Sequence, residues 1–136
     1  TQTENPDLSA ALIVDDDEWT LSTLAKAMDS AGLRAITAVN GVDALEKLSQ
    51  NVEEIKVIIL DLAMPEMTGF EAFRRLSKIG DDLPVIVASG FAADADHFTE
   101  VTGGDAYAIF QKPYQLEEMI EKVREIMDDS QLALSS

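Results

Sequence analysis

The chain has 136 residues, and its 26 acidic and 10 basic side chains give it a formal net charge of −16. A surface this acidic repels phosphate backbones and anionic lipids, so it disfavours contact with nucleic acid or a membrane and favours cations and basic protein surfaces. The chain has no cysteine, which excludes disulfides, thiolate metal sites and cysteine nucleophiles, and its apolar runs are far shorter than a membrane span.

Short apolar runs alternate with helical patterns along most of the chain. Residues 1–9 are expected to form a linker or tail, residues 10–127 one domain, and residues 128–136 a fraying C-terminal tail. Five apolar runs predict β-strands, and four of them are hydrophobic almost throughout, as in a parallel sheet that is covered on both faces. The runs lie at residues 11–14, 34–39, 56–60, 84–89 and 107–110.

Apolar residues at helical spacing predict a helix after each strand. The four clear stripes consist of Leu21, Leu24, Ala25 and Met28; Val42, Leu45 and Leu48; Phe70, Phe73 and Leu76; and Leu116, Met119, Ile120, Val123 and Met127. Gly32 and Gly80 follow the first and third stripes, where helices are expected to stop. A weaker pattern predicts a short helix over residues 91–102.

Five strands that alternate with five helices predict an α/β fold of (βα)₅ type, a doubly wound five-stranded parallel sheet. In such sheets, ligands bind beyond the carboxyl ends of the strands, near the point where the strand order reverses. The topology therefore indicates where functional residues should gather.

Polar or charged residues stand at the end of each central strand. The first run is followed by the acids of residues 15–18, and the third ends in Asp61. The fourth ends in Ser89, and the fifth is followed by Lys112 and Pro113. Taken singly, the acids could simply favour the N-terminal end of a helix dipole, and the other residues could open turns. Because parallel strands end at one edge of the sheet, the four signals together predict a single site.

Carboxylates brought close together repel one another, and a pKa rises unless a positive group intervenes. With oxygen ligands and no cysteine or neighbouring histidine, Mg²⁺ (or Mn²⁺) is the ion that fits best. A metal ion, a lysine, a hydroxyl and a central carboxylate can stabilise a phosphoryl group, whose transfer depends mainly on positioning and charge neutralisation. Asp61 is therefore expected to act as a nucleophile that forms an aspartyl phosphate.

With these residues the chain resembles the receiver domain of two-component response regulators, of the chemotaxis type. The resemblance covers about residues 10–127, with a flavodoxin-like fold. It is carried by four motifs in order: "LIVDDDE", "VIILDLAMPEMTGFE", "PVIVASG" and "FQKPYQLEEM". Several ordered motifs that agree with the topology are far more specific than any one of them.

The resemblance implies a role for each matching position. Asp61 corresponds to the phosphoacceptor, and Ser89 and Lys112 are expected to contact the phosphoryl group. The metal ligands would be Asp15, Asp16, Asp61 and the backbone carbonyl of Ala63. The switch residues would be Ser89, Ile109 and Pro113, with a cis bond between Lys112 and Pro113.

Three positions depart from the family pattern. Ile109 stands where the family usually has a switch aromatic, which puts the usual coupling of hydroxyl and aromatic in doubt. Ala63 and Phe91, two residues past the acceptor and the hydroxyl, cannot position water by hydrogen bonding. Slow loss of the phosphoryl group is therefore expected.

The single tryptophan and the single histidine are expected to have structural rather than catalytic roles. Trp19 is expected to be a helix residue that shields the core, since tryptophan is highly buried on average. His97 is expected to be a surface residue of the fourth helix and a poor candidate for a phosphodonor histidine.

The expected function is that of a phosphoacceptor domain, which is not an enzyme beyond catalysing its own phosphorylation and dephosphorylation. The alternative is a pseudo-receiver that binds proteins without being phosphorylated. A haloacid-dehalogenase-type phosphatase would need an acid at position 63, and a Rossmann-type nucleotide binder would need a glycine-rich loop after the first strand.

The resemblance also implies partners: a histidine kinase or phosphotransfer protein as donor, and a downstream protein on the face of the fourth helix, fifth strand and fifth helix. No nucleic acid or membrane contact is expected, and the location is expected to be cytoplasmic. The domain is expected to act alone or to come from a hybrid histidine kinase or a longer regulator, and the missing initiator methionine slightly favours the second.

Overall fold

The computed structural model describes residues 9–62, 69–80, 83–90, 98 and 106–135. These residues form a five-stranded sheet in the order β2-β1-β3-β4-β5, and every neighbouring pair is parallel. The doubly wound parallel sheet expected from the sequence is therefore confirmed. Its strands are β1 (Ala10–Val14), β2 (Arg34–Ala38), β3 (Ile55–Asp61), β4 (Val85–Ser89) and β5 (Ala108–Gln111).

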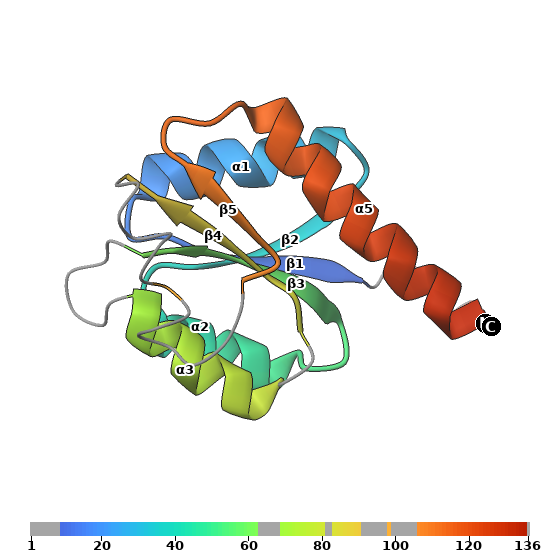
Figure 1. Ribbon diagram of the computed structural model, residues 1–136, viewed down its shortest axis with the longest axis horizontal. Coiled ribbons are helices and arrows are strands. Elements are labelled where there is room, and N and C mark those ends of the chain that lie inside the picture. Colours follow the sequence, from blue (N-terminus) through green and yellow to red (C-terminus); the bar gives the residue numbers. More distant parts are fainter. Residues whose placement is uncertain (1–8, 63–68, 81–82, 91–97, 99–105, 136) are drawn as a thin grey trace.

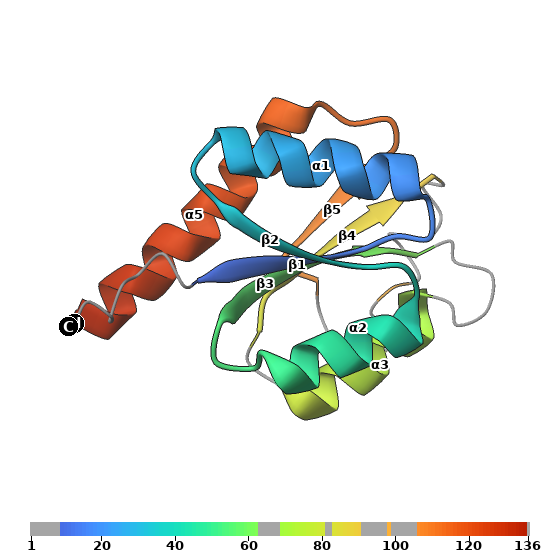
Figure 2. The same ribbon diagram turned by 180° about the vertical axis from the view of Figure 1, so that it is seen from behind.

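Helices cover both faces of the sheet, α1 and α5 on one side and α2 and α3 on the other (Figures 1 and 2). Their bounds are Glu18–Ser30 for α1, Gly41–Gln50 for α2, Gly69–Ile79 for α3 and Leu116–Ser135 for α5. The helix expected over residues 91–102 lies outside the described residues except for Phe98, which is helical and buried.

Alternate residues of the central strands enter two separate cores, because successive side chains of a strand point to opposite faces. Leu12 of β1 and Leu60 of β3 pack toward α2 and α3, in the core that also contains Phe98. Ile13 and Ile59 pack on the other face, against α1 and α5. Two apolar faces explain why these strands are hydrophobic almost throughout.

Local signals set two of the helix ends. Gly32 has φ of 80°, and Leu33 N–H donates to the Met28 carbonyl at 2.8 Å, so the glycine supplies the left-handed residue that ends α1. Asn40 begins α2, and its side-chain oxygen accepts a hydrogen bond from the Asp43 N–H at 2.7 Å. This is the usual N-cap arrangement, which satisfies one of the free donors of the first turn.

The last helix is longer than the sequence analysis expected. Residues 128–135 continue α5 to Ser135, and the domain bounds themselves stay a prediction. No glycine or proline interrupts residues 116–135, and most of these residues are good helix formers, so nothing in the sequence stops the helix at 127. None of the helices in the described part of the chain is long and apolar enough to cross a bilayer.

The strand order reverses at β1, which lies between β2 and β3. Crossovers from β1 and from β2 therefore leave in opposite directions, and a crevice opens beyond the carboxyl ends of β1 and β3. Functional side chains at this edge are held by central strands that are buried along almost their whole length.

Candidate functional site

Two buried carboxylates lie side by side at the reversal point. Val14 and Leu60 are paired in the parallel ladder of β1 and β3, so the residues that follow them, Asp15 and Asp61, reach the same edge of the sheet. Their exposed fractions are 5% and 3%. The next residue, Asp16, is exposed.

Carboxylate oxygens of Asp15, Asp16 and Asp61 all lie within 4.8 Å of one another. The donor set is therefore entirely oxygen, with two buried carboxylates and one exposed carboxylate. Such a set suits a hard divalent cation such as Mg²⁺, which prefers carboxylates and keeps several of its waters. The three acids that the sequence proposed for the metal are thus brought together.

Lys112 provides the positive charge of the site. Its ammonium lies 3.2 Å from Oδ1 of Asp61 and 3.5 Å from Oδ2 of Asp15. The Lys112 N–H donates to the Ser89 carbonyl at 2.7 Å, which fixes the residue at the end of β5 next to β4. The peptide bond between Lys112 and Pro113 is cis, the isomer that the sequence analysis expected.

Ser89 is the fourth strand-end residue of the site and is almost fully buried, with 1% exposure. Ala88 of β4 is paired with Asp61 in the ladder, so Ser89 follows directly beside the carboxylate. The sheet edge therefore gathers one hydroxyl, one ammonium and three carboxylates.

The electrostatics follow from this crowding. Burial raises the pKa of Asp15, and the neighbouring carboxylates, mainly Asp61, raise it further. The hydrogen bond from the Asp17 N–H and the charge of Lys112 lower this pKa, but they do not cancel the rise. Burial opposes the charged form of Lys112, but Asp61 and Asp15 outweigh it and raise the pKa of the ammonium. Lys112 is therefore firmly protonated at neutral pH, and one ammonium leaves the three carboxylates only partly neutralised.

The first turn of α1 holds its own acid in place. Asp15 accepts a hydrogen bond from the Asp17 N–H at 2.9 Å, and the Thr20 hydroxyl donates to Oδ2 of Asp17 at 2.6 Å. The Thr20 hydroxyl is the main reason why the pKa of Asp17 is lowered. Asp17 thus belongs to the helix start, while Asp15 and Asp16 face the site.

Trp19 corrects one expectation from the sequence. Its side chain is 73% exposed, so it does not shield the core. Leu21 and Leu24 carry the buried face of α1, and Trp19 lies away from that face, because residues two positions apart on a helix point in nearly opposite directions.

Other expected residues have different outcomes. Ile109 is 40% exposed, and its strand partner is Val87. Ala63, Phe91 and His97 lie outside the described residues, so the proposed metal carbonyl and the two positions expected to affect hydrolysis stay predictions.

Sequence reasoning missed Tyr114. Its ring packs edge-on against Phe110 with centroids 5.7 Å apart, and burial raises the pKa of its hydroxyl. The motif "QKPYQ" contained the signal, because a residue two positions after the site lysine must lie close to it.

A family model, the response regulator receiver domain, matches residues 11–124. The chain therefore belongs to the response regulator receiver family, a class of two-component signal transduction domains that are not conventional enzymes. Its acidic pocket of Asp15, Asp16 and Asp61 with Lys112 is that of a phosphoacceptor receiver.

Individual relatives agree with this assignment. The response regulator receiver protein CpdR of Brucella abortus is 31% identical over 116 residues, which cover 85% of this chain and 94% of CpdR. Response regulator MprA of a Mycobacterium strain (KMS) is 31% identical over 117 residues, which cover 85% of this chain and 49% of MprA. The chain thus spans about half the length of the first such relatives.

Solved structures show the same fold. A receiver domain protein from Clostridium thermocellum superposes with a TM-score of 0.82 at 22% identity, covering 92% of this chain and 98% of that one. The CheX–CheY–BeF₃–Mg²⁺ complex from Borrelia burgdorferi gives a TM-score of 0.76 at 25% identity, covering 87% and 88%. The Borrelia burgdorferi complex includes Mg²⁺.

Proposed function

We propose that Asp61 is the residue that accepts the phosphoryl group. The observation that carries the proposal is the position of its carboxylate, which is 3% exposed and lies 3.2 Å from the Lys112 ammonium. A rigid, desolvated oxygen nucleophile with a cation beside it is what phosphoryl transfer requires, since the protein contributes mainly position and charge.

In the proposed reaction a carboxylate oxygen of Asp61 forms a bond to phosphorus while the bond from phosphorus to the donor breaks. With a phosphohistidine donor, the leaving electron pair goes to the imidazole nitrogen, and the product is an aspartyl phosphate. Lys112 would hold an equatorial phosphoryl oxygen, and the Ser89 hydroxyl would donate a hydrogen bond to another.

We assign the metal site to Asp15, Asp16, Asp61 and the carbonyl of Ala63, with Mg²⁺ preferred over Mn²⁺. A bound Mg²⁺ would supply the positive charge that a phosphoryl group needs among three carboxylates. Asp15 and Asp16 would orient it, and their repulsion of Asp61 is the feature that favours a cation there.

The switch assignment to Ser89 and Ile109 has support from register. Val87 pairs with Ile109, and Val87 and Ser89, two residues apart, face the same side of the sheet. A shift of the Ser89 side chain toward the phosphoryl group could therefore be followed by Ile109 on the same face, at the exposed surface of β5.

The proposed partners are a histidine kinase or phosphotransfer protein as donor and a downstream protein on the surface that includes β5 and α5. The acidic charge of −16 supports basic protein surfaces as partners. The donor named here is a proposal, and the stimulus and the activity of any longer parent protein are not assigned.

The direct experiment is intact mass after incubation with acetyl phosphate and Mg²⁺. The wild type is expected to gain one phosphoryl group, Asp61→Asn none, and the exposed control Glu53→Gln the same as wild type. Folded wild-type protein that gains nothing from acetyl phosphate or from a kinase would contradict the proposal and favour the pseudo-receiver.

The lifetime of the phosphoryl group tests the positions that depart from the family pattern. Ala63 and Phe91 offer no group to position water, so the double variant Ala63→Asn, Phe91→Glu is expected to lose phosphate faster than wild type. Equal decay rates, followed by mass spectrometry after removal of the donor, would refute this argument.

A further inference from the structure

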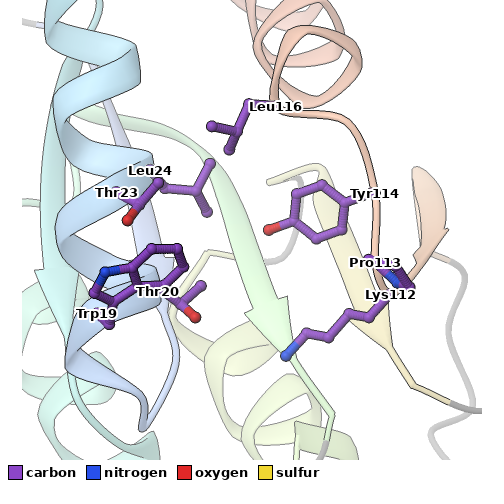
Figure 3. Close-up of a pocket in the computed structure, with 8 residues that line it drawn as sticks. All are labelled: Trp19, Thr20, Thr23, Leu24, Lys112, Pro113, Tyr114 and Leu116. Carbon is purple, nitrogen blue, oxygen red and sulfur yellow. The ribbon is translucent and has the colours of Figure 1, made fainter.

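An open cavity of about 540 Å³ lies between α1 and the segment that joins β5 to α5 (Figure 3). Its volume falls in the range of pockets that bind small organic molecules, roughly 300–1,000 Å³. The described residues that line it are Trp19, Thr20, Thr23, Leu24, Lys112, Pro113, Tyr114 and Leu116.

Most of the wall is apolar, and part of it consists of aromatic rings. The indole of Trp19 stands on the α1 side, and Tyr114 lies on the opposite side with its hydroxyl end directed toward α1 (Figure 3). Leu24 and Leu116 line the part of the cavity between them. Two rings on opposite walls favour a planar aromatic body, which gains both buried apolar area and ring contacts.

The polar part of the wall consists of hydrogen-bond donors. The Tyr114 hydroxyl points across the cavity toward α1 (Figure 3), and within the described residues neither it nor the Thr23 hydroxyl has a hydrogen-bond partner. Lys112 has three N–H bonds and contacts two carboxylates, those of Asp61 and Asp15, which leaves one for a ligand. None of the lining residues that the structure describes is acidic, so an acceptor atom is complementary to this wall.

The charges disfavour ionic ligands when no metal ion is bound. An anion would meet the surrounding negative charge of a chain with a net charge of −16. A cation would meet the ammonium of Lys112, which is the one charged group among the described residues of the wall. A second copy of the chain is disfavoured for the same reason, because two strongly acidic surfaces repel.

We propose that this cavity binds an uncharged, flat aromatic molecule whose acceptor oxygen takes hydrogen bonds from Tyr114 and Lys112. Because Lys112 also contacts Asp61, occupancy is expected to compete with the phosphoryl group for the ammonium. This second consequence rests on the proposed function; the binding itself does not.

Coumarin is a suitable probe, because it is planar and neutral and carries a lactone carbonyl. Titration of the full ¹⁵N-labelled chain is expected to give saturable shifts of the Trp19 indole N–H and of the Tyr114 and Leu116 amides. The expected Kd is on the order of 1 mM, as for a fragment of this size. Coumarin-3-carboxylate and benzyltrimethylammonium are expected to bind at least about fivefold more weakly, since each brings an uncompensated charge.

Variants locate the site. Trp19→Ala and Tyr114→Phe are each expected to weaken coumarin binding about fivefold, the second by loss of one hydrogen bond. The matched controls are Val42→Ala, an exposed apolar residue of α2, and Tyr107→Phe, an exposed tyrosine outside the cavity. No saturable shift up to about 10 mM coumarin, or equal affinity in all variants, would overturn the proposal and leave an apolar side chain of a protein partner as the occupant.

Phosphorylation by acetyl phosphate forms the second measurement. Saturating coumarin is expected to slow it several-fold. Binding without any slowing would show that the ligand does not engage Lys112, and the proposed orientation would be wrong. Wild type that is never phosphorylated, with coumarin binding intact, would refute the proposed function and not the site.

Discussion

Replacing the proposed phosphoacceptor, as in Asp61→Asn, is expected to stabilise the metal-free protein. The substitution removes one of three carboxylates that lie within 4.8 Å of one another and preserves the shape of the side chain. A structural residue at the end of a buried strand would be expected to behave in the opposite way, because its loss normally costs stability. The sign of the effect therefore separates a functional from a structural role.

The magnitude follows from the distances. At an effective dielectric constant of about 20, each of the two carboxylates near Asp61, taken at the limiting distance of 4.8 Å, repels it by about 3.5 kcal/mol. The Lys112 ammonium at 3.2 Å attracts it by about 5 kcal/mol on the same scale. The repulsion exceeds the attraction by about 2 kcal/mol, and the relieved desolvation of a buried charge adds to that gain.

Urea unfolding followed by circular dichroism at pH 7.5 and low salt measures the difference. In 10 mM MgCl₂ the wild type is expected to gain stability by binding the ion, and Asp61→Asn is expected to gain less. The difference in the free energy of unfolding between the two proteins is therefore expected to narrow. Glu53→Gln, an exposed acid on the same chain, measures the general benefit of removing one charge from −16. If Asp61→Asn unfolds at lower urea than wild type, or gains no more than Glu53→Gln, the electrostatic argument is refuted.

Three further variants test the fold. Phe98→Ala removes a side chain with 1% exposure that packs edge-on against Phe73 with centroids 4.8 Å apart, and a loss of about 3–5 kcal/mol in the free energy of unfolding is expected from urea titration. Asn40→Ala removes the cap of α2 and is expected to cost about 1 kcal/mol, measured by the same titration. Tyr107→Phe removes a hydroxyl that donates a hydrogen bond to the Glu125 carboxylate at 2.6 Å. In the wild type this hydrogen bond lowers the pKa of Glu125. In the variant the pKa of Glu125 is expected to be higher than in wild type, as measured by ¹³C NMR titration. In wild type the hydrogen bond stabilises the folded state at pH values above the usual glutamate pKa. This stabilisation is lost as the pH falls through the pKa of Glu125 in the folded protein.

Much of the site could be predicted from the sequence because two regularities combine. Near-continuous apolar runs predict parallel strands with both faces covered, and parallel strands end at one edge. Asp15 and Asp61 follow paired residues of β1 and β3, so their approach needs only the correct register. The convergence of acids, hydroxyl and lysine is thus a property of the backbone.

Side-chain conformation could not be predicted in the same way. Whether Lys112 would point to Asp61, to Asp15 or into solvent depends on rotamers of a long flexible chain, and the structure places it against both carboxylates. The average behaviour of tryptophan predicts a buried Trp19, whereas the stripe of Leu21 and Leu24 indicates that Trp19 lies off the buried face. Local periodicity was the better guide at that position.

The division between predictable and unpredictable residues also separates what is common to receivers from what is particular to this chain. The residues that topology places at the sheet edge, Asp61 and Lys112, perform the proposed transfer, because parallel strands bring their carboxyl ends to one edge. The residues set by side-chain chemistry, Ile109 at the surface of β5 and Trp19 at the rim of the cavity, carry 40% and 73% exposure and can be changed with little cost to the core. Differences in switching and in what the cavity accepts are therefore expected to arise from these exposed positions, while the chemistry at the sheet edge stays the same.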